Sequence, residues 1–357
     1  MIQMATYPFN KSGELKDIGM RPAIKGMYGM PSFPSRKINT PITPKENWAR
    51  ICNGEKPLWI PNVTIDFNAI QPEIMPDALA RNKGGFDWFG IDWEYEPLSN
   101  AAMVRPGTRR LSDITKWEEE IIWPDLSAID WQKDYEENYK DSLSPDRPTM
   151  FVIVNGFYER LADLTSFEDT LCAFLEEPEA VEAFYTRLCD WHIELIKIAK
   201  EVYDADVITF HDDMGTQRSS FFSPALFAEV MLPHYQRMNA AAHEMGLIMN
   251  FHSCGSVANQ IGNFIAAGFD FWEGQDACND KFAIAAEYGD RLGQTAFMMP
   301  SPDSAEEDIK ANIIRRIKEI GKYGKYMVFL GGNPQSSFNA AEFMYEMSRR
   351  YYLGEEI

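Results

Sequence analysis

The sequence predicts an α/β protein with a (β/α)8 TIM-barrel fold. Eight short apolar runs recur along the chain, helical patterns separate most of them, and 357 residues are enough for a barrel with extensions. A doubly wound open sheet is the alternative architecture. No glycine-rich nucleotide-binding fingerprint follows the early strands, and this favours the barrel.

The predicted strands are nearly continuous apolar segments, which is typical of a parallel sheet covered on both faces. They span residues 58–64, 86–92, 149–155, 206–211, 247–252, 269–273, 292–298 and 326–331.

Two of the predicted helices carry clear end signals. Ser223-Pro224 predicts an N-cap followed by proline at the first helical position, and the helix should run to about Met245 with Gly246 as its C-cap. Residues 305–321 form an amphipathic pattern that also closes with glycine.

Two segments lie outside the regular alternation. Residues 1–57 are predicted to be an N-terminal arm, because much of this segment is rich in Gly, Pro and Met and shows no period. The catalytic barrel domain should span 58–357. Residues 93–148 are too long for a simple βα-loop and predict an insertion that covers one end of the barrel.

Composition excludes two classes of protein. Hydrophobic residues make up 45% of the chain, too many for a disordered protein. Acidic residues number 54 against 34 Lys and Arg, for a net charge of -20, which repels phosphate backbones and argues against nucleic-acid binding.

The chain is expected to be cytoplasmic and not associated with a membrane. Its N-terminus lacks the basic and apolar regions of a signal peptide, and no apolar run reaches the ~20 residues that span a bilayer. Five scattered cysteines do not suggest a disulfide framework. The sequence does not fix the oligomeric state, and a homo-oligomer is compatible with it.

The sharpest chemical signal is His252-x-Cys254, at the predicted carboxyl end of a strand, where active sites of TIM barrels lie. Residues i and i+2 of an extended segment point to the same side. An imidazole and a thiol can therefore meet on one zinc ion. Two ligands alone do not make a site, and both side chains can also be ordinary buried residues.

Carboxylate residues also stand at the ends of neighbouring predicted strands. Asp213, after His211 and Asp212, is a candidate metal ligand or acid, although Asp213 can also cap a turn and Asp212 can pair with Arg218. Glu273 ends the strand after that of His252 and is a candidate ligand. Tyr158 and Glu159 end an earlier strand and could touch substrate, but a structural loop contact explains them equally well. Cys278 lies farther into the loop and is better explained as a buried small apolar residue.

At this point the sequence resembles a known family. The stretches ITFHDDMGTQRSSFFSPALF and MNFHSCGSVANQIGNFIAAGFDFWEGQDACND resemble the uroporphyrinogen decarboxylase superfamily, most closely its corrinoid-dependent methyltransferases. The resemblance covers about residues 45–350 and is specific in 206–280. The decarboxylases carry an N-terminal RQAGR motif, whereas this chain reads MRPAIKGMYGMPSFP in that region. Decarboxylation of a porphyrinogen is therefore not expected.

The resemblance implies a zinc ion bound through His252 and Cys254. Family members add a distant cysteine near the last strand, but here that strand ends in LGGNPQSS. Glu273, Asp213 or Cys278 would have to replace it. Glu273 is favoured, because its strand should lie beside that of His252 and because Asp213 has a turn-capping alternative.

The expected function is transfer of a methyl group from a small molecule, best a methoxylated aromatic, to a corrinoid (cobalamin) carried by a partner protein. Zinc would polarise the leaving oxygen, Asp213 or Glu159 would supply a proton, and Tyr158 would touch substrate. The alternatives are a lyase acting on another carboxylate substrate and a non-catalytic barrel that only binds a ligand or a corrinoid protein.

Overall fold

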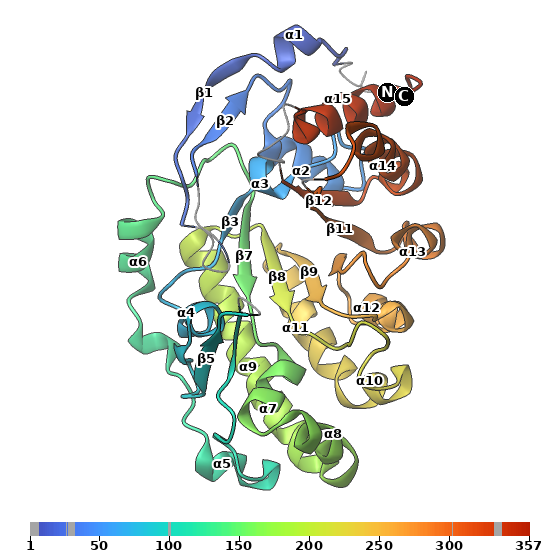
Figure 1. Ribbon diagram of the computed structural model, residues 1–357. Coiled ribbons are helices and arrows are strands. Elements are labelled where there is room, and N and C mark those ends of the chain that lie inside the picture. Colours follow the sequence, from blue (N-terminus) through green and yellow to red (C-terminus); the bar gives the residue numbers. More distant parts are fainter. Residues whose placement is uncertain (1–6, 26, 28–32, 99–100, 302, 332–337) are drawn as a thin grey trace.

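A parallel sheet that curls into a half-barrel forms the centre of the protein (Figure 1). The structure is a computed structural model that describes residues 7–25, 27, 33–98, 101–301, 303–331 and 338–357. The order in the seven-stranded sheet is β12-β11-β10-β9-β8-β7-β3. Its strands are β3 (Asn68–Ile70), β7 (Thr149–Ile153), β8 (Val207–His211), β9 (Ile248–Ser253), β10 (Phe271–Gly274), β11 (Gly293–Met298) and β12 (Tyr326–Leu330).

The predicted segment 58–64 joins this sheet at its open edge. Asn62 forms a parallel bridge with Val328 of β12, and the side chain of Asn62 also exchanges hydrogen bonds with the backbone of Leu330. The sheet and its surrounding helices therefore have the TIM-barrel-like architecture that the sequence predicted.

One predicted barrel strand is wrong. Residues 86–92 contribute to a separate antiparallel sheet of β4 (Gly85–Phe86), β5 (Asp92–Glu96) and β6 (Ala101–Val104). The chain turns between β4 and β5, where the carboxylate of Asp87 accepts hydrogen bonds from the N–H groups of Phe89 and Ile91, both at 2.9 Å. The strand that pairs with β7 in the barrel sheet is instead β3, which is too short to form a recognisable apolar run.

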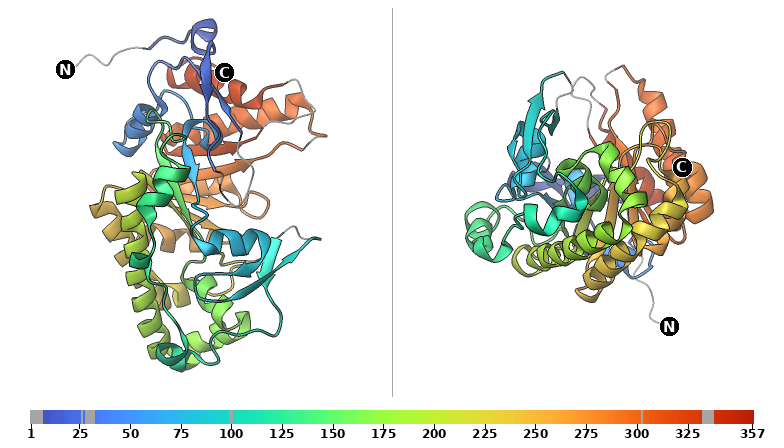
Figure 2. Two further views of the ribbon diagram at one scale, coloured as in Figure 1. Left: turned by 90° about the vertical axis from the view of Figure 1, so that its left-hand side faces the viewer. Right: turned by 90° about the horizontal axis from the view of Figure 1, so that it is seen from below.

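Helices cover the outer face of the sheet (Figures 1 and 2). The predicted helix over 223–245 is present but divides at Met231 into α10 and α11, with Ser223 as the N-cap, and α14 confirms the helix predicted over 305–321. None of the described helices combines the length and apolar character that a membrane crossing requires. The covering helices are α7 (Phe157–Leu164), α8 (Phe167–Glu176), α9 (Pro178–Tyr203), α10 (Pro224–Val230), α11 (Leu232–Glu244), α12 (Ile261–Ala266), α13 (Lys281–Tyr288), α14 (Glu306–Glu319) and α15 (Ala340–Tyr352).

The described part of the N-terminal segment packs against the barrel. It contains α1 (Lys11–Glu14), β1 (Asp17–Arg21), β2 (Ser35–Ile38) and α2 (Pro44–Cys52). Trp48 and Ile51 of α2 join the apolar cluster inside the barrel, where Trp48 contacts the ring of Phe271. The buried Arg349 of α15 holds Glu14 of α1 at 2.8 Å and fixes the other end of the segment.

An insertion between β3 and β7 begins earlier than the predicted residue 93. It starts with α4 (Pro76–Lys83), continues through the β4–β6 sheet and ends with α5 (Trp117–Glu120) and α6 (Trp131–Asn138). The fully buried guanidinium of Arg160, on α7, pairs with Asp87 at 2.7 Å and with Asp77 of α4. These ion pairs fasten the insertion to the barrel.

His192 is expected to make the fold sensitive to acid. It lies on α9 without exposure to solvent, and neither ring nitrogen has a hydrogen-bond partner among the described residues. Burial, together with the nearby charge of Arg160, lowers the pKa of His192 to about 3. Below the unfolded pKa of about 6.5, the unfolded chain binds a proton that the native chain excludes, so stability falls as the pH falls.

We expect the free energy of unfolding to drop by about 2 kcal/mol between about pH 7 and about pH 5 through this group alone. Urea denaturation of the wild type and of His192→Phe at both pH values measures it. The variant keeps an aromatic ring among Phe157 and Phe210. On acidification, the free energy of unfolding of His192→Phe should fall by about 2 kcal/mol less than that of the wild type. Equal losses in the two proteins would contradict the role of His192.

Candidate metal centre

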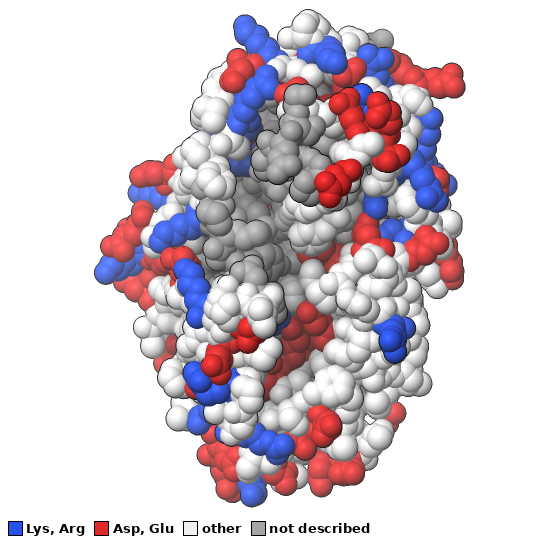
Figure 3. All heavy atoms as spheres, in the orientation of Figure 1, with Lys and Arg blue, Asp and Glu red and all other residues white. Residues whose placement is uncertain are grey.

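Polar side chains from three adjacent strands meet at the carboxyl ends of β8, β9 and β10. The strand register sets His252 level with His211 on one side and with Glu273 on the other. The two imidazole rings stack with centroids 4.0 Å apart and planes at 11°. Figure 3 shows that the molecule is hollowed over the carboxyl ends of the central strands, with acidic side chains in the depth of the hollow.

The two nitrogens of His252 face different partners. Nδ1 lies 2.7 Å from Oε1 of the fully buried Glu273. Nε2 lies 3.4 Å from Sγ of Cys254 and 3.6 Å from Oδ1 of Asp213. The side of the ring that carries Nε2 is therefore the side on which an imidazole, a thiol and a carboxylate converge.

Asp213 is held at this point by the backbone. Its Oδ1 accepts a hydrogen bond of 2.7 Å from the N–H of Cys254, so the carboxylate ties β8 to β9. Nδ1 of His211 lies 3.9 Å from the same oxygen. Among the described residues, His211, Asp213 and His252 each offer one ligand atom, all within 4.8 Å of one another.

The electrostatics of the cluster favour a cation at this place. Burial disfavours a charged imidazole, but hydrogen bonds with Cys254 and Glu273 and the charge of Asp213 outweigh it and raise the pKa of His252 well above its ordinary value. Burial raises the pKa of Cys254, and Asp213 adds to the effect. Negative partners that raise the pKa of this imidazole also favour a metal ion beside it. The nitrogen, sulfur and oxygen donors are those that zinc accepts.

Glu273, which the sequence favoured as the third metal ligand, lies on the Nδ1 side of the His252 ring. Its Oε1 binds Nδ1 of His252, and its Oε2 accepts a hydrogen bond of 3.1 Å from Asn250. The structure does not bring this carboxylate to the Nε2 side of the ring. A carboxylate behind a histidine fixes the tautomer and the orientation of a metal-ligating imidazole.

Glu159 lies beside His211 and is paired with an arginine that the sequence analysis missed. Its Oε1 accepts from Arg81 of α4 at 2.7 Å, and its Oε2 lies 3.1 Å from Nδ1 of His211. Burial opposes the charge, but Arg81 and His211 outweigh it and hold the pKa of Glu159 well below its ordinary value. Glu159 therefore stays ionised and is poorly suited to donate a proton.

Asp212 and Tyr158 face away from this cluster. The fully buried carboxylate of Asp212 accepts from the N–H groups of Tyr158 and Glu159, at 2.9 and 2.8 Å, and from the hydroxyl of Tyr235. It thereby caps the first turn of α7 and does not pair with Arg218. The ring of Tyr158 packs against Phe221 and other aromatic rings, and no hydrogen bond joins its hydroxyl to a described residue.

Gln275 and Cys278 complete the surroundings of the thiol. Nε2 of Gln275 donates to Sγ of Cys254 at 3.3 Å, while its Oε1 accepts from the N–H of Gly255 at 3.0 Å. Sγ of Cys278 lies 3.7 Å from the same Oε1. The amide of Gln275 thus stands between the two cysteines, and its loop position gave no sequence signal.

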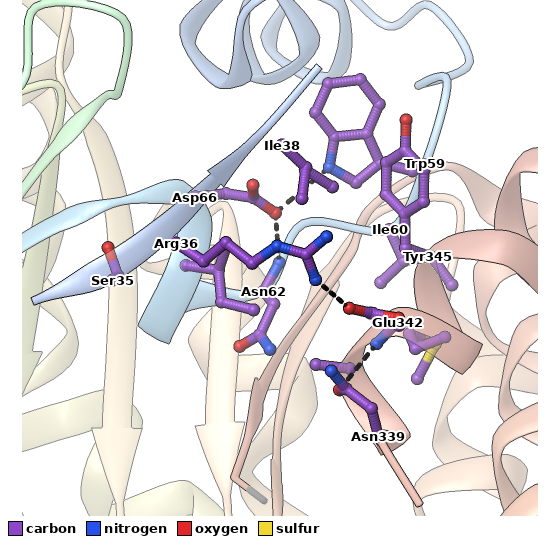
Figure 4. Close-up of a pocket in the computed structure, with 13 residues that line it drawn as sticks. Ser35, Arg36, Ile38, Trp59, Ile60, Asn62, Asp66, Asn339, Glu342 and Tyr345 are labelled. Atoms are coloured by element: carbon purple, nitrogen blue, oxygen red, sulfur yellow. Dashed lines mark hydrogen bonds and ion pairs between the residues drawn. The ribbon is translucent and has the colours of Figure 1, made fainter. Parts of the chain in front are cut away.

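A cavity of about 130 Å³ lies elsewhere, between β2, residues 59–66 and α15 (Figure 4). Arg36 and Glu342 form an ion pair in its wall. None of the candidate ligands lines this cavity, and it has no part in the cluster.

Comparison with known proteins places the chain among related folds. The model of the uroporphyrinogen decarboxylase (URO-D) family matches residues 89–331. A methyltransferase from Methanosarcina mazei has a similar structure, with 14% identity, 87% of this chain and 99% of that chain covered, and a TM-score of 0.64. At this identity the likeness concerns the fold. A search among curated proteins gives no significant match.

Two other solved structures match over smaller shares of the chain. A sugar phosphate isomerase/epimerase from Parabacteroides distasonis is 14% identical over 62% of this chain and 76% of that chain, with a TM-score of 0.33. A dihydropteroate synthase from Anaplasma phagocytophilum is 15% identical over 48% of this chain and 71% of that chain, with a TM-score of 0.29.

Proposed function

The chain belongs to the uroporphyrinogen decarboxylase family, and on that basis we propose that it is a methyltransferase that moves a methyl group from a small methylated substrate to the corrinoid of a partner protein. The observation that carries the proposal is the convergence of Nε2 of His252, Sγ of Cys254 and Oδ1 of Asp213 at the mouth of the barrel. The similar fold of the Methanosarcina mazei methyltransferase supports this choice within the family.

His252, Cys254 and Asp213 would hold a zinc ion, with one position left for substrate. When bound, zinc supplies Lewis-acid polarisation of the oxygen that leaves the methyl group. Asp213 replaces the cysteine that the last strand lacks, although residues 332–337 of that segment lie outside the described residues. Because it brings oxygen in place of sulfur, Asp213 makes the site more electrophilic and better suited to an ether than to a thiol.

The surrounding residues orient the three proposed ligands and would supply a proton to the reacting oxygen. Glu273 holds the imidazole of His252 by Nδ1 and leaves Nε2 for the metal. Arg81 keeps Glu159 ionised, and Glu159 in turn holds Nδ1 of His211. Because Asp213 belongs to the ligand set and Arg81 keeps Glu159 ionised, we assign protonation of the leaving oxygen to His211.

In the proposed methyl transfer, one bond breaks in the donor and one bond forms to the acceptor. The carbon–oxygen bond of the substrate breaks, and its electron pair stays on oxygen, which takes up a proton. The electron pair of the new carbon–cobalt bond comes from the reduced corrinoid of the partner.

The experiment is to mix the zinc-loaded protein, a reduced corrinoid protein and a panel of methyl donors, and to follow methylcobalt formation by absorbance.

The expected result is methylcobalt formation with at least one donor, and only when the enzyme, the donor and the corrinoid protein are all present. Methylcobalt that forms equally fast without this chain, or no formation with any donor, contradicts the proposal.

Exchanging one carboxylate at a time separates the ligand from the orienting residue. Asp213→Asn removes a proposed ligand and should weaken zinc binding by more than about 100-fold, whereas Glu273→Gln should weaken it by about 10-fold to 100-fold, as losses of orienting partners do. Competition with a chromophoric chelator measures both. Asp270→Asn, which breaks a histidine–carboxylate pair with His243 elsewhere, should bind zinc like the wild type. A larger loss in Glu273→Gln than in Asp213→Asn would make Glu273 the ligand, as the sequence first suggested.

A further inference from the structure

Gln275 follows β10 directly, and its side chain reaches the loop that carries Cys254. Its Nε2 donates a hydrogen bond to Sγ of Cys254 at 3.3 Å, and its Oε1 accepts one from the backbone N–H of Gly255 at 3.0 Å. A backbone N–H can only donate, so the contact with Gly255 fixes which end of the amide carries the oxygen. The N–H end of Gln275 therefore faces the sulfur.

The buried side chain of Asn279 joins the loop after β9 to the loop after β10. Its Oδ1 accepts hydrogen bonds from the N–H groups of Val257 and Ala258, both at 3.1 Å. Its Nδ2 donates to the carbonyl oxygens of Gly255 and Gln275, at 2.8 and 2.7 Å. Because these four bonds use both ends of the amide, the backbone that carries Gln275 is fixed relative to the loop of the thiol.

Two side-chain nitrogens of the described residues lie within hydrogen-bond distance of Sγ of Cys254. They are Nε2 of His252, at 3.4 Å, and Nε2 of Gln275, at 3.3 Å. In the proposed centre Nε2 of His252 is a metal ligand, so the N–H of Gln275 remains as the donor to the sulfur. Hydrogen bonds from the protein to a metal-bound cysteine sulfur change the electronic properties of the metal.

We propose that Gln275 is a positioning residue, which orients the thiolate of Cys254 through its N–H and reduces the electron donation from this sulfur to the metal. The inference rests on the proposed function and adds a residue to its site. A hydrogen bond to a charged acceptor is stronger than one between neutral groups, so the contact should strengthen when the thiol loses its proton. Weaker donation by sulfur leaves the metal more electrophilic toward the leaving oxygen, in the same direction as the oxygen ligand of Asp213.

Cobalt(II) in place of zinc gives a readout that does not depend on methyl transfer, because the sulfur-to-cobalt charge-transfer band reports the electron density on the thiolate. The spectra of the wild type, Gln275→Leu and Gln275→Glu are compared at about pH 8, where a glutamate is ionised. Gln275→Leu removes both ends of the amide. Gln275→Glu keeps an oxygen for the N–H of Gly255 and removes the donor to the sulfur.

We expect the charge-transfer band to move to longer wavelength in both Gln275 variants, because the thiolate holds its electrons less tightly without the hydrogen bond. The ligand-field bands should keep the intensity of the wild type, because the number of ligands does not change. With zinc loaded, kcat should fall by about 10-fold in both variants, and KM for the corrinoid protein should not change.

Two variants serve as controls and should keep the spectrum and the activity of the wild type. Gln236→Leu removes an exposed amide of α11, which donates to the carbonyl oxygen of Ala266 at 3.0 Å. Cys278→Ala removes the thiol that lies 3.7 Å from Oε1 of Gln275 and leaves the N–H end of the amide in place.

A band at the wild-type wavelength in both Gln275 variants would overturn the inference. A shift in Gln275→Leu that is absent in Gln275→Glu would also overturn it, because the amide would then only brace the loop at Gly255. In either case active methyl transfer by the wild type leaves the proposed function standing. A cobalt-loaded wild type without a sulfur-to-cobalt band would remove Cys254 from the metal centre, and the proposed centre and this inference would both fail.

Discussion

Cys254→Ala is expected to lose its zinc and to reduce methyl transfer by at least about 1,000-fold. Cys254 supplies the sulfur donor nearest to Nε2 of His252, at 3.4 Å, and without it the proposed set falls to one nitrogen and one carboxylate. Catalytic zinc is usually held by three protein ligands, so two should not retain the ion against a chelator. A barrier increase of about 4 kcal/mol corresponds to the expected loss in rate.

Metal content by mass spectrometry and the initial rate of methylcobalt formation measure the two effects. Cys278→Ala is the matched control, because the amide of Gln275 separates that thiol from Cys254. It should keep one zinc per chain and most of the activity. Full zinc content in Cys254→Ala, or equal losses in both variants, would contradict the assignment of Cys254.

Arg160→Met is expected to destabilise the protein by about 3–5 kcal/mol, which is typical for the loss of one partner from a buried ion pair. Arg160 is fully buried between Asp77 and Asp87, and its removal leaves two carboxylates in the interior without a cation. Burial already raises the pKa of Asp77 to about 6 despite the arginine. The free energy of unfolding from urea denaturation at about pH 7 measures the loss.

Arg109→Met offers the matched comparison. Arg109 pairs with Asp169 at 2.7 Å, but both side chains are about half exposed, and such pairs contribute less than about 1 kcal/mol. Similar losses in the two variants would show that the buried pairs do not fasten the insertion. Because α4 carries both Asp77 and Arg81, Arg160→Met should also loosen the contact between Arg81 and Glu159.

Most of the barrel could be predicted from the sequence because its central strands are fully buried. β7, β8 and β12 are apolar on both faces and appear as continuous runs of apolar residues. The segment 86–92 has a similar composition for another reason: Trp88 and Phe89 pack against the apolar core, whereas Phe86 is exposed and Asp87 turns the chain. Composition alone does not separate a buried strand from a buried turn.

The candidate site was predictable to the extent that strand register determines it. His252, Asp213 and Glu273 end adjacent parallel strands, and their proximity follows from the order β8-β9-β10. The sequence could not show which nitrogen of His252 each carboxylate faces. Tyr158 and Glu159 are adjacent on a helix and therefore point in different directions, so only Glu159 reaches His211. Arg81 comes from an insertion helix, whose position no strand pattern fixes.

Zinc titration of the metal-free protein tests the central claim most directly. The protein is stripped with a chelator and mixed with a reduced corrinoid protein and an active methyl donor, and zinc is then added in steps. We predict negligible methylcobalt formation without zinc, a linear rise in rate with added zinc, and a plateau at one equivalent per chain. A full rate in the metal-free protein, or a rate that does not respond to zinc, would contradict a metal-dependent methyl transfer at His252, Cys254 and Asp213.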